Sequence, residues 1–114
     1  FRVLGRTAKE EKKIINDLMF VEKAGSFAVV LESVTENLAK KINKISKIPV
    51  IGIGASKNCD GQILVTEDLL GLSNNFPKFV KRYENLRSKI KQAVQKYYID
   101  VVKGNFPRKS NIYR

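Results

Sequence analysis

One carboxylate in this sequence stands where acid–base chemistry would need it. Glu32 directly follows the apolar run Phe27–Leu31, which is continuous and partly β-branched, as in a buried parallel strand. A carboxylate at the carboxyl end of such a strand faces the edge at which barrel folds place their active sites. Glu32 is therefore the candidate general base. From the residues alone, a structural glutamate that closes a loop or pairs with a lysine explains the position at least as well.

Two glycines end the next apolar run, Val50–Gly54. Gly52 and Gly54 could let the backbone approach a bound anion, or they could serve unusual dihedral angles and close helix packing. The second interpretation is at least as strong. The run lacks the third glycine and the following helix of a dinucleotide-binding motif.

The polar residues around the third apolar run are weaker candidates. Asp60 and Gly61 are typical of a turn. Gln62 and Asp68 flank the strand expected over Ile63–Val65 and could line the mouth of a pocket.

Composition excludes several classes of site. Cys59 is the one cysteine and the chain has no histidine, which excludes an internal disulfide, a Cys/His zinc site and a Cys–His nucleophile. With 43% hydrophobic and 29% charged residues, we expect a globular protein of the cytoplasm. The longest apolar run, Phe27–Leu31, is too short to cross a bilayer, and Phe1–Leu31 does not resemble a signal peptide.

The formal net charge of +11 is unevenly spread, because residues 76–114 carry 11 basic and only 2 acidic side chains. Together with Tyr83, Tyr97 and Tyr98, this segment could form a small nucleic-acid-binding module, which is the alternative function. A solvated cationic face explains the charge more simply. Core packing likewise explains Tyr83 and Tyr97, which fall on an apolar stripe.

Hydrophobic periodicity and capping residues predict alternating helices and strands. The expected elements are a helix from a Thr7–Glu10 capping box to Gly25, a strand over Phe27–Leu31, a helix from Thr35 to Ile45, strands over Val50–Gly54 and Ile63–Val65, and a helix over about Lys78–Lys103. This order favours an α/β fold with a parallel βαβ unit. The eight residues Ala55–Gln62 are short for a parallel crossover, so a hairpin there stays open.

Four stretches in register carry a family resemblance. They are Val30–Val34 (VLESV), Ile48–Ala55 (IPVIGIGA), Cys59–Val65 (CDGQILV) and Phe76–Tyr83 (FPKFVKRY). Together they resemble the C-terminal half of ketopantoate hydroxymethyltransferases, over nearly the whole chain. The resemblance implies the C-terminal portion of a (β/α)₈ barrel, strands six to eight, with a short link in place of one crossover helix. Since a complete barrel needs about 250 residues, residues 1–114 are expected to be a single partial domain of a longer enzyme.

The resemblance also implies the chemistry, with Glu32 in the place of the family's proton-abstracting glutamate. The implied reaction moves a hydroxymethyl group from methylenetetrahydrofolate to 3-methyl-2-oxobutanoate, in pantothenate (coenzyme A) biosynthesis. It implies Mg²⁺ on the substrate, with ligands in the N-terminal part, so no metal ligand and no cofactor-binding residue is assigned in this chain. A large homo-oligomer such as a decamer is expected, with no nucleic-acid or membrane partner.

The sequence departs from the family pattern in two places. Gly54-Ala55-Ser56 stands where many relatives have Gly-Ala-Gly. The tail Arg108–Tyr113 replaces the acidic residue, His and Ser that usually follow Phe-Pro, so any role of that histidine is absent.

Overall fold

The computed structural model describes residues 2–113, which form two compact units. The sheet unit contains the residues up to Val65 together with Pro77–Val80. The helical unit contains Thr66–Phe76 together with the residues from Lys81 onward.

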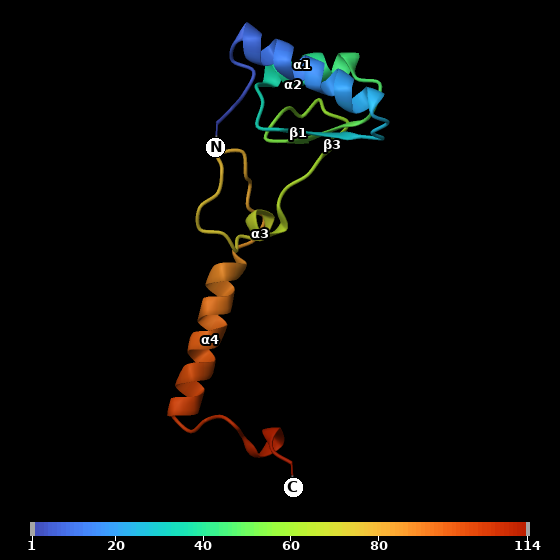
Figure 1. Ribbon diagram of the computed structural model, residues 1–114. Helices are drawn as coiled ribbons and strands as arrows, with labels where there is room; N and C mark the ends of the chain where they lie inside the picture. Colours follow the sequence, from blue (N-terminus) through green and yellow to red (C-terminus); the bar gives the residue numbers. More distant parts are fainter. Residues whose placement is uncertain (1, 114) are drawn as a thin grey trace. The chain divides into compact units, whose positions relative to one another are not determined.

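The sheet unit is a parallel three-stranded sheet with two helices. Its elements are α1 (Ala8–Lys23), β1 (Val29–Glu32), α2 (Glu36–Ile45), β2 (Val50–Ile53) and β3 (Gly61–Gln62). The strand order is β1-β2-β3, and both neighbouring pairs run parallel. Figure 1 shows α1 and α2 on the same face of this sheet. The α/β class and the parallel βαβ unit are thereby confirmed.

Both helices begin at the predicted caps. The Thr7 Oγ1 accepts from the Glu10 N–H at 3.2 Å, and the Glu10 carboxylate accepts from the N–H groups of Gly5 and Arg6 at 3.1 and 3.0 Å. Thr35 caps α2 by accepting from the Leu38 N–H at 3.4 Å, and its hydroxyl also donates to the Gly5 carbonyl at 3.1 Å. The two helix starts therefore share the short segment around Gly5.

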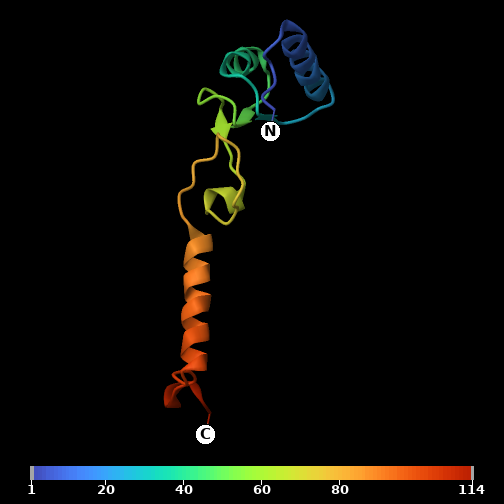
Figure 2. The ribbon, with the colours of Figure 1, turned by 90° about the vertical axis from the view of Figure 1, so that its left-hand side faces the viewer.

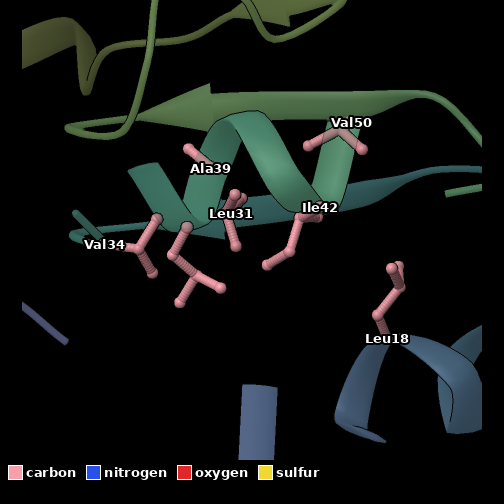
Figure 3. Packing of buried hydrophobic residues seen from close by; sticks show 7 residues of the cluster. Leu18, Leu31, Val34, Ala39, Ile42 and Val50 are labelled. Atoms are coloured by element: carbon pink, nitrogen blue, oxygen red, sulfur yellow. The ribbon is translucent and has the colours of Figure 1, made fainter. Parts of the chain in front are cut away.

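The core lies between the helices and the sheet. Leu38 and Ile42 of α2 are fully buried, and they pack with Leu31 and Val50 from the strands and with Leu18 from α1. Figure 3 shows these side chains converging between the elements. The helical spacing of the apolar residues along α2 thus determines which face of the sheet this helix covers.

Strand β1 was expected to be buried on both faces, and this is wrong for the described residues. Leu31 is 7% exposed, whereas its neighbour Val30 is 55% exposed and Glu32 is also exposed. The reason is that both helices of the unit cover one face, while successive side chains of a strand point to opposite faces. The second face, with Val30 and Glu32, has no helix of this unit over it.

The third strand lies earlier than predicted. It covers Gly61–Gln62 rather than Ile63–Val65, and it runs parallel to β2, so the hairpin alternative is excluded. The Asp60 carboxylate accepts from the Val50 N–H at 2.8 Å, and the Asp60 N–H donates to the Val50 carbonyl at 2.9 Å. These two hydrogen bonds bring the chain back to the start of β2. A return over so short a strand needs only about 10 Å, which a few extended residues can span.

The helical unit contains α3 (Thr66–Leu69), α4 (Leu86–Val102) and a short 3₁₀ turn, η1 (Lys109–Asn111). The sequence did not predict α3. No helix of the described residues is long and apolar enough to cross a membrane.

The long basic helix begins at Leu86 and not at about Lys78 as expected. The backbone N–H groups of Tyr83 and Leu86 donate to the carbonyls of Leu69 and Leu70 at 2.8 and 3.0 Å, which holds the preceding segment out of a helix. Asn85 then caps α4 by accepting from the Ser88 N–H at 3.4 Å. An asparagine cap and these loop bonds outweigh the apolar periodicity that extends upstream.

The apolar stripe of α4 is exposed. Tyr97 is 57% exposed and Tyr83, which lies outside the helix, is 66% exposed, so the expectation that both pack in a core is wrong for the described residues. Tyr97 contacts only the Phe106 ring among aromatic partners in this part of the chain, with ring centroids 5.4 Å apart. Figures 1 and 2 show no other long element of the unit running along α4.

Candidate active site at the carboxyl ends of the strands

Glu32 is the last residue of β1, and its Cα pairs with that of Ile53, the last residue of β2. Because Leu31 points into the helix-covered core, Glu32 points to the opposite face, where it is exposed. Among residues 2–113, no hydrogen bond or ion pair engages its carboxylate. The interpretation of Glu32 as a structural partner of a lysine therefore has no support here, and the carboxylate is available for chemistry.

The backbone directly after Glu32 is held in an unusual conformation. Ser33 has φ +51°, in the left-handed region that residues other than glycine rarely adopt. Its N–H donates to the Ile53 carbonyl and its carbonyl accepts from the Leu4 N–H, both at 2.9 Å. The Ser33 side chain is buried, and its hydroxyl has no partner among the described residues. Backbone bonds on both sides thus fix the end of β1 directly after Glu32.

Gly52 serves packing. It is buried and pairs with Leu31, so it lies on the helix-covered face and away from Glu32. A Cβ at this position would lie 3.0 Å from the Cys59 Sγ and 3.2 Å from the Gln62 amide. The structure therefore favours the packing interpretation over an anion contact.

Gly54 follows β2 at the same edge as Glu32. Its φ of +61° suits glycine, and an added Cβ would lie 2.7 Å from the Cγ of Phe79. The Phe79 ring therefore lies directly against the Gly54 backbone. Phe79 belongs to the Pro77–Val80 piece of the sheet unit.

The remaining candidates stabilise the loop or lie elsewhere. Asp60 closes the link to β2, and the Gln62 Nε2 donates to the Ser56 carbonyl at 2.7 Å. Cys59 is half-buried beside Gly52. Asp68 lies within α3 of the helical unit rather than beside a strand.

No metal site emerges from this part of the chain. Among the described residues, no group of three or more His, Cys, Asp or Glu side chains lies close enough to hold a metal ion.

The outer edge of β1 pairs with no strand of the described residues. Beside this edge lies an apolar recess between α1 and β1, lined among others by Ile14, Val21 and Val29. An open parallel edge beside half-buried apolar side chains is where a further strand and helix would add.

Two features of this edge were not predicted from the sequence. A left-handed serine has no local signal, because serine is not a residue typical of that conformation. Phe79 lies in one of the stretches that carry the family resemblance, and its contact with Gly54 joins residues far apart in the sequence. The left-handed Gly54 was among the interpretations left open.

Comparison with known proteins gives a consistent result. A family model described as ketopantoate hydroxymethyltransferase matches residues 1–109. The chain is 47% identical to the 3-methyl-2-oxobutanoate hydroxymethyltransferase of Kosmotoga olearia over 114 residues, covering 99% of this chain and 43% of that protein. The enzymes of the same name from Pelagibacter ubique and Clostridium beijerinckii are 47% and 44% identical, with 44% and 42% of their lengths covered. The chain thus spans less than half the length of the curated relatives it matches.

Proposed function

Because the chain belongs to the ketopantoate hydroxymethyltransferase family, we propose that it carries the general base of a hydroxymethyl transfer. The acceptor is 3-methyl-2-oxobutanoate, the one-carbon donor is methylenetetrahydrofolate, and the product is ketopantoate for pantothenate biosynthesis in the cytoplasm. The remaining part of the active site lies outside these residues.

The observation that carries this proposal is the exposed, unengaged carboxylate of Glu32 at the carboxyl end of a parallel strand. Glu32 takes the proton from the branched carbon next to the keto group. The electron pair of that C–H bond becomes the enolate, whose carbon forms the new C–C bond to the one-carbon unit. The bonds from the one-carbon unit to the folate nitrogens break, water supplies the hydroxyl group of the product, and tetrahydrofolate leaves. A base of this kind contributes about 10²–10⁴-fold to the rate.

Magnesium belongs to the proposal by family resemblance. A bound Mg²⁺ would polarise the keto acid and stabilise the negative charge of the enolate. The resemblance assigns its ligands to the rest of the protein, and the described residues bring no three His, Cys, Asp or Glu side chains together. The step assigned to Glu32 is proton removal alone.

We further propose that the three strands are the sixth to eighth of a (β/α)₈ barrel, with residues 1–114 as one partial domain at its C-terminal end. The open edge of β1 and the helix-free face that presents Glu32 and Val30 support this placement, because a barrel closes such an edge and encloses such a face. The exposed apolar stripe of α4 supports packing in a large homo-oligomer such as a decamer.

The proposed function is tested by ketopantoate formation in the protein at its natural full length. We expect Glu32→Gln to abolish most turnover. The matched control is Glu36→Gln, because Glu36 is an exposed glutamate that only pairs with Lys40 on α2, at 2.8 Å. Parent-like turnover in Glu32→Gln would overturn the assignment of the base.

A further inference from the structure

Phe79 reaches the same edge of the sheet as Glu32, the proposed base, although the two residues lie 47 positions apart in the sequence. Its ring occupies the space that a side chain at position 54 would need, since an added Cβ would lie 2.7 Å from Cγ and 2.8 Å from Cε1. Real Cβ atoms essentially never approach so closely, so Gly54 and Phe79 fit each other as a pair.

A short backbone path connects this ring to Glu32. Gly54 directly follows Ile53, and the Ile53 carbonyl accepts from the Ser33 N–H at 2.9 Å. Ser33, at φ +51°, directly follows Glu32. The Glu32–Ser33 peptide, which anchors the proposed base at the end of β1, is therefore hydrogen-bonded to the Ile53–Gly54 peptide at the end of β2, which the Phe79 ring covers.

The Phe79–Gly54 contact and the Ile53–Ser33 hydrogen bond together form a clamp. The clamp is needed because of the backbone conformations of the two residues it holds, Gly54 and Ser33. Gly54 has no Cβ, so without a neighbour its backbone would sample many conformations. Ser33 adopts a left-handed conformation at a cost in free energy, and such a residue keeps it only where its surroundings over-determine it. A ring packed against Gly54 restricts the Ile53–Gly54 peptide, whose carbonyl in turn holds Ser33.

We infer that Phe79 is a positioning residue for the Glu32 carboxylate, acting through Gly54, Ile53 and Ser33. The inference rests on the proposed function, because it assigns a purpose to the clamp only if Glu32 is the base. Phe79 touches the strand end and not the reacting atoms. Its loss should therefore misplace the base without removing it.

The test uses the protein at its natural full length and the variants Phe79→Ala, Phe79→Leu and Glu32→Gln. The measurement is deuterium exchange into 3-methyl-2-oxobutanoate without folate, expressed per folded molecule and resolved into kcat and KM. We expect Phe79→Ala to lower kcat for exchange by about 10–100-fold at little changed KM, because small misplacements of a reacting group have effects of this size. The larger side chain of Phe79→Leu should restore part of the rate.

A role in folding alone would give a different result. Phe79→Ala and Phe79→Leu would then lower the melting temperature while each folded molecule exchanged at the parent rate, which would overturn the inference and leave the proposed function intact. A parent protein without exchange would overturn both. If Phe79→Ala does not fold, the exchange rate per folded molecule of Phe79→Leu, compared with that of the parent, decides between the two roles.

The contact itself is tested by combining Gly54→Ala with Phe79→Ala. We expect Gly54→Ala to destabilise the parent more than it destabilises the Phe79→Ala variant, because the added Cβ meets the ring only in the parent. Equal destabilisation in both backgrounds would show that the ring does not lie on Gly54, and the clamp would fail.

Discussion

At the scale of single residues, the edge of the sheet combines one free carboxylate with one strained neighbour. Glu32 has no partner among the described residues, while Ser33 is held by backbone bonds to Ile53 and Leu4. Functional sites commonly store strain of this kind, at about 1–3 kcal/mol for each residue. The Glu32 carboxylate is thus exposed, and the backbone that follows it has little freedom to move.

Two serines allow a matched test of hydrogen bonding. Ser33→Ala should leave the free energy of unfolding unchanged or raise it, because the Ser33 hydroxyl is buried without a partner. Ser46→Ala should lower it by about 1–3 kcal/mol, because the Ser46 hydroxyl bonds the backbone of Ile48 and the carboxylate of Glu22. Urea unfolding of the full-length protein measures both, and a larger loss for Ser33→Ala than for Ser46→Ala would contradict this view.

Glu10 provides a test of pH dependence. The N–H of Arg6 lowers the pKa of the Glu10 carboxyl most, and the charge of Arg2 and the N–H of Gly5 lower it further, against a smaller opposing effect of desolvation. A lowered folded-state pKa means that the stabilising contribution is complete above the ordinary value of 4.5 and is lost as the pH falls through the folded value. We expect the Gly5 and Arg6 amide NMR signals to shift in that acidic range in the parent but not in Glu10→Gln. Shifts centred above 4.5 would be inconsistent with these bonds.

At the scale of elements, the link between β2 and β3 decides the topology. Asp60 bonds both backbone groups of Val50, one through its carboxylate and one through its N–H. Asp60→Ala should therefore lower the free energy of unfolding by about 1–3 kcal/mol, because it leaves the Val50 N–H without an acceptor. Asp60→Asn, which retains a side-chain oxygen, should lower it less. Equal losses in the two variants by urea unfolding would argue against this role.

How well the sequence predicted each element depended on whether local residues determine it. The caps Thr7 and Thr35 were predicted correctly, and so was the end of the first helix near Gly25, whose φ is +88°, since capping and glycine conformation act within a few residues. The starts of β3 and α4 were not, since bonds between segments distant in the sequence, such as Tyr83 to Leu69, determine them. Periodicity alone also could not show that the stripe of α4 stays exposed.

The same distinction between local and long-range determinants applies to the candidate site. The position of Glu32 at a strand end could be inferred from the apolar run before it, and its proposed role came from the family resemblance. Its environment could not be inferred, because Ser33, Ile53 and Phe79 reach it through backbone bonds and packing between separate strands and loops.

At the scale of the whole molecule, the main feature that indicates contact with a partner is exposed apolar surface. Val30 on the sheet and Val94 on α4 are 55% and 60% exposed. Surfaces of this kind normally mark contacts with other parts of a protein or with other subunits. We therefore expect residues 1–114, expressed alone, to be poorly soluble or molten. A sharp cooperative unfolding transition from a monomeric sample would argue strongly against the partial-barrel proposal.

The helix α4 allows the apolar and the basic surfaces to be separated. Replacing Ile90 and Val94 by serine should dissociate the proposed oligomer of the full-length protein, because both side chains are exposed on the apolar stripe. The control replaces Lys89, Lys91 and Lys96 by glutamine, which should change stability by only about 0–1 kcal/mol and retain the oligomer, since exposed charges contribute little. Analytical ultracentrifugation distinguishes the two, and dissociation by the lysine changes alone would make the basic face the working surface.

The most direct test of the central claim concerns proton exchange at Glu32. Exchange of deuterium into the branched carbon of 3-methyl-2-oxobutanoate, with magnesium supplied and no folate, depends on the base but not on one-carbon transfer. Glu32→Gln keeps the size and much of the hydrogen bonding of the side chain but cannot accept the proton. We expect exchange in the full-length variant to fall by about 10²–10⁴-fold, together with turnover, while substrate binding stays near that of the parent. Exchange at the parent rate would show instead that the proton leaves to a base other than Glu32.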